Sequence, residues 1–161
     1  MTRTLVTYFS VYGTAEKTAE EIARQTGGDL IEIEPAVPYD GNREHYNSLA
    51  RLAKKEHDED KRPEIKNDIP ISEYDEIFLG YPMWWYTFPM IIYTLFDKYD
   101  FSGKTIIPFN THMGSGDGGT YDTIRQLAPE ASVLEGLSVE MQDAEKGVQG
   151  TVKEWLASIA L

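Results

Sequence analysis

The chain contains no cysteine among its 161 residues. This absence excludes disulfide cross-links, thiolate metal sites, cysteine nucleophiles and CxxC redox chemistry, and it argues against a secreted fold held by disulfides. Basic residues are also scarce, with 15 Lys and Arg against 27 Asp and Glu, which gives a formal net charge of -12. Nucleic-acid-binding domains carry the opposite charge, and anionic membranes would repel such a chain. We therefore expect neither a nucleic-acid partner nor a membrane partner.

The N-terminus lacks a signal-peptide pattern, because MTRTLVTYFS runs directly into a strand pattern with no hydrophobic region and cleavage site. The stretch 77–96 is uncharged and long enough to resemble a membrane helix. However, Gly80, Pro82 and Pro89 interrupt it, and its aromatic residues are spread along it instead of gathering at its ends. We therefore interpret it as part of a domain that resides in the cytoplasm.

The chain does contain enough hydrophobic sequence for a core, at 41% of its residues, and 161 residues is a length typical of one domain. We interpret residues 1–161 as a single domain in which strand-like and helical patterns alternate. Strands are expected at 5–9, 30–33, 77–81, 104–109 and 133–139, the last one broken, and helices at 15–23, 44–58, 89–99, 120–127 and 148–159.

Local signals mark several of these boundaries. Gly27 stops the first helix, Thr120 is the expected N-cap of the fourth, and Pro129 ends it. Pro108 conflicts with a regular fourth strand because proline removes a ladder donor, so we interpret it as a bulge near the strand end.

This alternation predicts an α/β fold with a parallel sheet that is covered by helices on both faces. Such sheets bind ligands beyond the carboxyl ends of their strands. The loops after the first, third and fourth strands are therefore the places to look for a site.

The loop after the first strand, residues 10–15, opens directly into a helix. The amide groups and the partial positive charge at a helix N-terminus suit a phosphate. Gly13 permits a tight turn, and Ser10 and Thr14 add hydroxyl donors. Because the loop contains no Lys or Arg, a phosphate here would be held by neutral donors. A capped helix without a ligand is the alternative interpretation.

The loop after the third strand contains two adjacent tryptophans, Trp84 and Trp85. Indole rings are costly to leave in water, so these two either pack beneath neighbouring loops or present their faces to a flat aromatic ligand.

The loop after the fourth strand, residues 111–119, contains a G-x-G-x-x-G pattern. The dinucleotide-binding fingerprint normally follows the first strand, so we interpret this segment as a flexible loop whose amides lie along a planar ligand's polar edge. His112 is either a loop residue with a satisfied side chain or a proton donor.

The carboxyl ends of parallel strands share one edge of a sheet, so the three loops are expected to meet. Together they suit a flat, phosphorylated ligand that forms hydrogen bonds and is held without a cluster of basic side chains. Flavin mononucleotide (FMN) fits this description. The sequence contains no P-loop and no His/Asp/Glu cluster that suggests a metal.

Three motifs carry a resemblance to the flavodoxin family over essentially the whole chain: F-S-V-Y-G-T at 9–14, G-Y-P-M-W-W at 80–85 and T-H-M-G-S-G at 111–116. The resemblance implies a doubly wound, five-stranded parallel sheet of order 2-1-3-4-5 that binds one FMN per chain. It implies that residues 82–86 border the flavin ring and that residues 111–116 run along its pyrimidine edge. The candidate cofactor-binding residues, loop by loop, are Ser10, Tyr12, Gly13, Thr14 and Ala15; Pro82, Met83, Trp84, Trp85 and Tyr86; and Thr111, His112, Met113, Gly114, Ser115 and Gly116.

The chain departs from this family in the phosphate loop. Tyr12 and Ala15 stand where many flavodoxins carry hydroxyl residues, so the amide groups of residues 12–15 are expected to hold more of the phosphate. The long segment between the second and third strands, with Tyr39 and Tyr46, is expected near the ring in a role that the sequence leaves open.

The favoured interpretation is a flavodoxin-type electron carrier, because no catalytic acid–base set is evident. Redox partner proteins with a basic docking surface would suit its charge, and the chain would act as a monomer or a homodimer. The alternative is an FMN-dependent NAD(P)H oxidoreductase that acts on quinones or azo compounds, with His112 as a proton donor. A third interpretation is a non-redox binding module that does not use FMN.

Overall fold

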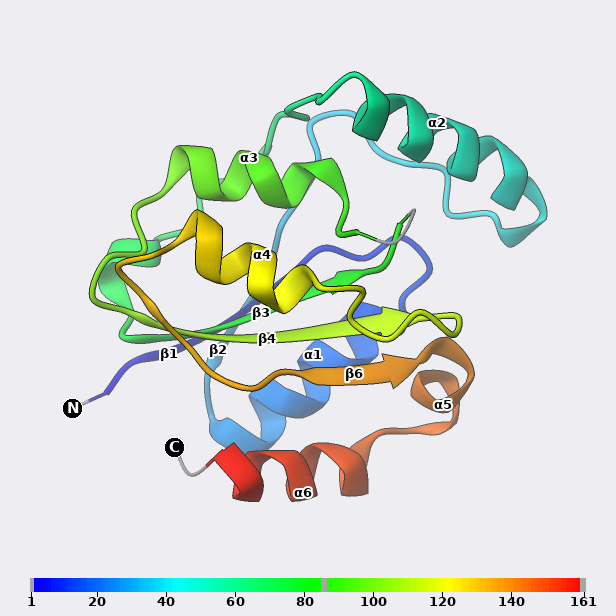
Figure 1. Ribbon diagram of the computed structural model, residues 1–161. Helices are drawn as coiled ribbons and strands as arrows, with labels where there is room; N and C mark the ends of the chain where they lie inside the picture. The colour runs from blue at the N-terminus through cyan, green and yellow to red at the C-terminus, as the bar shows by residue number, and fades with distance from the viewer. Residues whose placement is uncertain (1, 85–86, 160–161) are drawn as a thin grey trace.

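The computed structural model describes residues 2–84 and 87–159 (Figure 1). Its centre is a parallel sheet of order β2-β1-β3-β4-β5, with β6 also paired to β4, which confirms the predicted order. The strands are β1 (Thr4–Tyr8), β2 (Asp29–Glu32), β3 (Glu76–Pro82), β4 (Thr105–His112), β5 (Ser132–Val133) and β6 (Leu137–Glu140).

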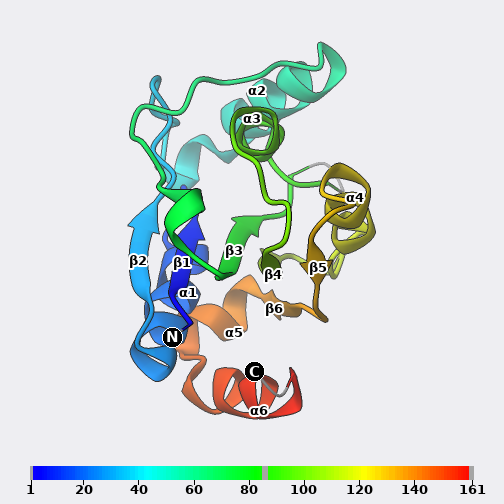
Figure 2. The same ribbon diagram turned by 90° about the vertical axis from the view of Figure 1, so that its left-hand side faces the viewer.

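Helices cover both faces of the sheet (Figures 1 and 2). They are α1 (Thr14–Thr26), α2 (Tyr46–Asp58), α3 (Met90–Lys98), α4 (Thr120–Leu127), α5 (Met141–Lys146) and α6 (Gln149–Ile159), with short 3-10 helices η1 (Arg43–His45) and η2 (Ile71–Glu73). The helix α5 was not predicted from the sequence. No helix among the described residues has the length and hydrophobicity needed to cross a membrane.

Two hydrophobic clusters, one on each face of the sheet, form the core. Leu5 belongs to the cluster that packs under α3 and α4, whereas its neighbour Val6 belongs to the cluster under α1 and α6. Ile77 and Phe78 divide between the faces in the same way. Successive strand residues point to opposite faces, so a sheet covered on both sides needs the continuous hydrophobic runs that the sequence shows.

The fifth strand is broken, as predicted, and the structure shows where the extra residue lies. Ile106 pairs with Val133 and Phe109 with Leu137, so three steps along β4 match four steps along its neighbour. The carbonyl of Ile106 accepts a hydrogen bond from the Leu134 amide, so the backbone polar groups of Ile106 face the edge strand. Backbone groups of residues two apart in a strand face the same side, so the backbone nitrogen of Pro108 also faces the edge strand. The missing donor of Pro108 therefore coincides with a bulge in the edge strand, while β4 itself stays regular against β3. The expected bulge in β4 is wrong.

The start of α4 also differs from the prediction. Gly119, with a left-handed φ of 82°, occupies the N-cap position, and Thr120 is the first helical residue. The Thr120 hydroxyl instead donates to the carbonyl of Asp117 at 2.7 Å, inside the preceding loop.

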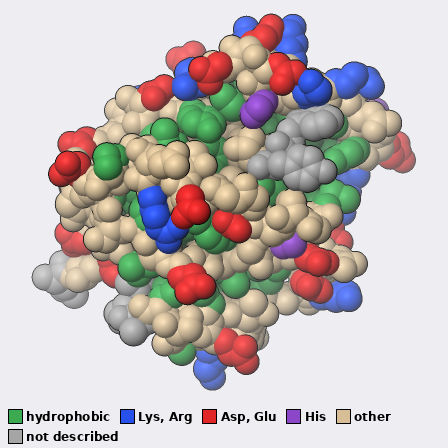
Figure 3. Space-filling view, viewed as in Figure 1, with side chains coloured by type: hydrophobic (Ala, Val, Ile, Leu, Met, Phe, Trp, Pro, Cys, Tyr) green, Lys and Arg blue, Asp and Glu red, His purple; other side chains and the backbone are tan. Residues whose placement is uncertain are grey.

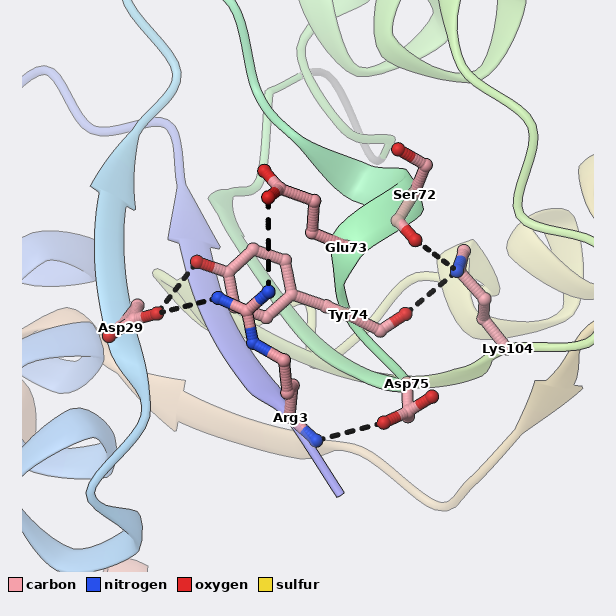
Figure 4. A network of polar contacts seen from close by, with 7 residues as sticks. All are labelled: Arg3, Asp29, Ser72, Glu73, Tyr74, Asp75 and Lys104. Carbon is pink, nitrogen blue, oxygen red and sulfur yellow. Dashed lines mark hydrogen bonds and ion pairs between the residues drawn. The ribbon is translucent and has the colours of Figure 1, made fainter. Parts of the chain in front are cut away.

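A polar network ties together the amino ends of four strands, at the edge of the sheet opposite the candidate site (Figure 4). The Tyr74 hydroxyl donates to Asp29 at 2.7 Å, and the Arg3 guanidinium lies 4.8 Å from the centre of the Tyr74 ring. The Lys104 ammonium donates to the Tyr74 carbonyl at 2.7 Å. These contacts join the segments that lead into β1, β3 and β4 to the first residue of β2.

Candidate functional site

A cavity of about 620 Å³ lies at the carboxyl ends of the strands, where the loops after β1, β3 and β4 meet α2 and α5. Its size is in the range of small-molecule sites, which is about 300–1,000 Å³. Most of the predicted cofactor-binding residues line it: Ser10, Tyr12, Thr14, Pro82, Met83, Trp84, Thr111, His112, Met113, Gly114 and Ser115.

The other predicted residues do not line this cavity or are not described. Gly13 forms the turn into α1 with a φ of 90°, and the Ala15 side chain is buried in the protein. The carbonyl of Gly116 faces the Asn110 side chain. Trp85 and Tyr86 lie outside the described residues, so any contact from them stays a prediction.

The phosphate loop is shaped by its own hydrogen bonds. Gly13, in a left-handed conformation that favours glycine, donates its amide to the Ser10 hydroxyl at 3.1 Å. The Thr14 hydroxyl donates to the Thr111 hydroxyl at 3.3 Å, which joins the first loop to the third. Because no side chain of the described residues caps α1, the amides of its first turn are available to an anion.

Trp84 forms an aromatic wall of the cavity. Its ring meets Phe9 and Tyr39 edge to face, at centroid distances of 5.5 Å and 5.2 Å. Its backbone is clamped by reciprocal hydrogen bonds with Thr87, at 2.7 Å and 3.1 Å. Trp84 thus packs beneath neighbouring segments, as one of the two interpretations predicted, and it borders the cavity as well. Its contact with a flat ligand stays a prediction.

Buried polar side chains brace the loop between β4 and α4. The Asn110 amide donates to the Gly116 carbonyl at 2.9 Å, and the Tyr121 hydroxyl donates to the Asn110 side-chain oxygen at 2.6 Å. Burial raises the pKa of Tyr121 above its ordinary value, with Tyr81 and Asp117 adding to the effect, so its hydroxyl stays protonated and able to donate. Asn110 and Tyr121 carry no motif that the sequence analysis could have read.

His112 is oriented by its own loop. Its Nδ1 accepts a hydrogen bond from the Gly114 amide at 2.9 Å. An accepting Nδ1 places the proton of the neutral imidazole on Nε2. The ring that borders the cavity is therefore held as one tautomer with an N–H group free of this bond.

The helix α2 covers one side of the cavity with residues that the sequence analysis did not assign to the site. The resemblance placed the long segment that contains this helix near the ring and named only Tyr46 from the helix. The helical spacing of its apolar residues was visible in the sequence, but which of them face the cavity was not. The lining residues that were not predicted are Val11, Asn47, Leu49, Ala50, Ala53 and Met141.

Tyr39 connects α2 to the aromatic wall, although it does not line the cavity itself. Its hydroxyl donates to the Glu56 carboxylate, with distances of 2.8 Å and 2.9 Å to the two oxygens. Burial raises the pKa of Glu56, and the hydrogen bond from Tyr39 partly opposes that rise. The position of α2 therefore depends on a half-buried carboxylate.

Charge around the site differs in one respect from the sequence-based expectation. The loop 10–15 itself contains no base, but Arg43 of η1 lies over the Tyr12 ring, with its guanidinium carbon 5.5 Å from the ring centre. Acidic side chains are scattered among basic ones over the face shown in Figure 3 and do not form a single patch there.

Comparison with known proteins gives consistent relatives. The sequence profile of the family described as Flavodoxin matches residues 3–159. A provisionally named flavoprotein of Bacteroides eggerthii is 32% identical with a TM-score of 0.83, and the match covers 100% of this chain and 99% of that one. A second such protein, from Bacteroides uniformis, is 31% identical with a TM-score of 0.84, over 97% and 98% of the two chains.

A more distant structure contains a ligand. The flavoprotein of Lactobacillus acidophilus, solved in complex with FMN, is 24% identical with a TM-score of 0.71, and the match covers 91% of this chain and 98% of that one. No match was found among curated protein sequences.

Proposed function

Because this chain belongs to the flavodoxin family, we propose that it binds FMN in the cavity at the carboxyl ends of its strands and transfers electrons through it. The observation that carries the proposal is the meeting of three loops of different chemistry in one cavity. The FMN complex of the Lactobacillus acidophilus flavoprotein supports the choice of ligand.

The residues present fit FMN. The first-turn amides of α1 and the hydroxyls of Ser10 and Thr14 form a neutral donor set for a phosphate. Trp84 offers an aromatic surface of the kind that packs against a flat ring. The backbone amides of Met113 and Ser115 would supply donors for a polar ring edge, whereas the Gly114 amide already donates to His112. The buried Tyr12 hydroxyl makes no hydrogen bond to any described residue.

Bound FMN would supply one- or two-electron redox chemistry, and the protein would contribute position and electrostatics. Thr14 and Thr111 hold the first and third loops together, which sets the distance between the phosphate end and the ring end of the cavity. Asn110 fixes the third loop from below through the Gly116 carbonyl. The face of α2 formed by Leu49, Ala50 and Ala53 would limit the access of water to the site.

A redox partner with a basic docking surface suits the net charge of -12. Long-range attraction between opposite charges is screened by salt, with a Debye length of about 10 Å at 0.1 M. The rate of electron transfer to such a partner should fall as salt is added. A rate that is independent of salt would remove this part of the proposal.

A second candidate is an FMN-dependent NAD(P)H oxidoreductase that acts on quinones or azo compounds, and His112 favours it. His112 lines the cavity, and the tautomer set by the Gly114 amide leaves its Nε2–H as a hydrogen-bond donor that would orient a substrate oxygen. To donate a proton, the ring would first take one up at Nδ1 and give up the bond from the Gly114 amide. A steady-state assay with NAD(P)H and a quinone separates this enzyme from a carrier.

The absorption spectrum of the purified protein tests the primary proposal, followed by anaerobic reductive titration. We expect a flavin spectrum, extraction of FMN on denaturation, and reduction by a chemical electron donor. A colourless protein that also fails to take up added FMN would refute the proposal and favour a non-redox binding module.

A further inference from the structure

Two segments that are far apart in the sequence, those of Arg43 and Glu145, meet beside the phosphate loop. The guanidinium carbon of Arg43 lies 5.5 Å from the centre of the Tyr12 ring, and the same guanidinium forms an ion pair with Glu145 of α5. Figure 1 shows α5 and α2, which directly follows η1, at the end of the sheet where the site lies. The contact therefore joins the segment before α2 to α5 across the first loop.

The segment that carries Arg43 rests directly on the phosphate loop. A Cβ added to Gly41 would lie 3.1 Å from the carbonyl oxygen of Val11, which is a tight contact. Glycine at this position lets the backbone approach the loop. Because the segment is in contact with residues 11 and 12, the position of Arg43 is set relative to the phosphate loop.

Tyr12 adds an unused donor to this arrangement. Its ring lines the cavity, and its hydroxyl oxygen is buried without a hydrogen bond to any described residue. Burial raises the pKa of Tyr12, as do Tyr46 and Asp40, so the hydroxyl keeps its proton. A buried hydroxyl without a partner lowers stability unless a ligand satisfies it.

We propose that Arg43, held between the Tyr12 ring and Glu145, supplies the cation of the phosphate site and makes the protein prefer FMN over riboflavin. This inference rests on the proposed function. A guanidinium placed over an aromatic ring and beside a carboxylate loses less conformational freedom when an anion binds than a free side chain would. The arrangement replaces, from outside the loop, the positive charge that residues 10–15 lack.

The roles of Arg43 and Glu145 predict opposite effects on FMN. Removing the charge of Arg43 leaves Glu145 uncompensated, and its repulsion then acts on the phosphate. Removing the charge of Glu145 leaves the positive charge of Arg43 unopposed. Riboflavin has no phosphate, so its affinity should stay the same in both cases.

The test uses the full-length apoprotein and measures the dissociation constants of FMN and riboflavin by fluorescence titration at low and high salt. At low salt, Arg43→Gln should weaken FMN by about three- to tenfold, and Glu145→Gln should tighten it by about two- to threefold. The double variant should lie between the two. Added salt should strengthen FMN binding to Arg43→Gln, because the repulsion from Glu145 is screened.

Matched controls are Arg51→Gln, which removes another exposed arginine from the same part of the chain, and Glu154→Gln on α6. Neither should change the ratio of the FMN and riboflavin constants by more than about twofold. Arg43 and Glu145 are both substantially exposed, so their substitutions should leave the fold intact, which circular dichroism can confirm.

The outcomes separate this inference from the proposed function. If wild type binds FMN but Arg43→Gln weakens the binding of FMN and riboflavin equally, the ion pair only stabilises the fold around the site and the inference is wrong. The inference also fails if Glu145→Gln weakens FMN instead of tightening it. If wild type binds neither flavin, the proposed function itself is refuted, and the inference with it.

Discussion

Replacing Thr14 by valine tests the phosphate end of the cavity with little change in side-chain shape. The Thr14 side chain is buried, lines the cavity, and donates to Thr111 at 3.3 Å. Each hydroxyl has one proton, and the Thr14–Thr111 bond can reverse its direction, so when a phosphate binds Thr14 can donate to it and accept from Thr111. Valine removes both possibilities.

The size of the effect follows from the kind of hydrogen bond that is lost. A bond between two neutral hydroxyls contributes about 0.5–1.5 kcal/mol, so Thr14→Val should lower the free energy of unfolding of the apoprotein by about this amount. A hydrogen bond to a charged phosphate is worth about 1.5–3 kcal/mol. Since about 1.4 kcal/mol is a factor of ten, FMN should bind about ten- to a hundredfold more weakly, while riboflavin should change little.

Thr18→Val is the matched control, because Thr18 lies one turn further along α1 and is equally buried. Its hydroxyl donates to the Thr14 carbonyl at 3.1 Å and does not line the cavity. This variant should lose stability while keeping the wild-type ratio of FMN to riboflavin affinity. Equal losses of FMN and riboflavin binding in Thr14→Val would show that Thr14 does not face the phosphate.

Three further predictions concern the aromatic wall, the sheet and α2. FMN should quench the tryptophan emission of the apoprotein, and Trp84→Phe should remove much of that quenching; unchanged quenching would place Trp84 away from the ring. Gly80→Ala should lower the free energy of unfolding by about 1–3 kcal/mol in urea, because its Cβ would lie 2.2 Å from the buried Phe109 ring; an unchanged midpoint would contradict this packing. Burial raises the pKa of Glu56 above its ordinary 4.5, so ionising it opposes folding and stability should fall as pH rises above 4.5. Glu56→Gln, which keeps an acceptor for Tyr39, should therefore be more stable than wild type at pH 7 and equal to it below pH 4. Equal stability of the two proteins at both pH values would show that burial of Glu56 does not raise its pKa.

The sequence by itself determined the layered fold and the edge of the sheet at which the cavity lies. Strand residues such as Leu5 and Val6 are apolar in succession because the sheet is covered on both faces, and that pattern is local. Gly27 ends α1 in a left-handed conformation, which the sequence also predicted as a stop. The three loops were located because parallel strands place their carboxyl ends at one edge, whatever the side-chain details.

Local signals were less reliable where two elements compete for the same residues. Pro108 was expected to distort its own strand, yet the bulge lies in the neighbouring edge strand, which has fewer hydrogen bonds to lose. Thr120 has the chemistry of an N-cap, but its hydroxyl is used by the preceding loop and by Tyr81 at 2.7 Å. A single residue's propensity does not say which of two available partners it takes.

Only the tertiary structure decided how the cavity is closed. The placement of α2 over it, the support of the third loop by Asn110 and Tyr121, and the position of Arg43 between Tyr12 and Glu145 all join residues distant in the sequence. Each of these side chains reads in the sequence as an ordinary polar or helical residue. Their roles arise from which segments the folded sheet brings together, and hydrophobic periodicity carries no information about those pairings because it reports only which face of an element is buried.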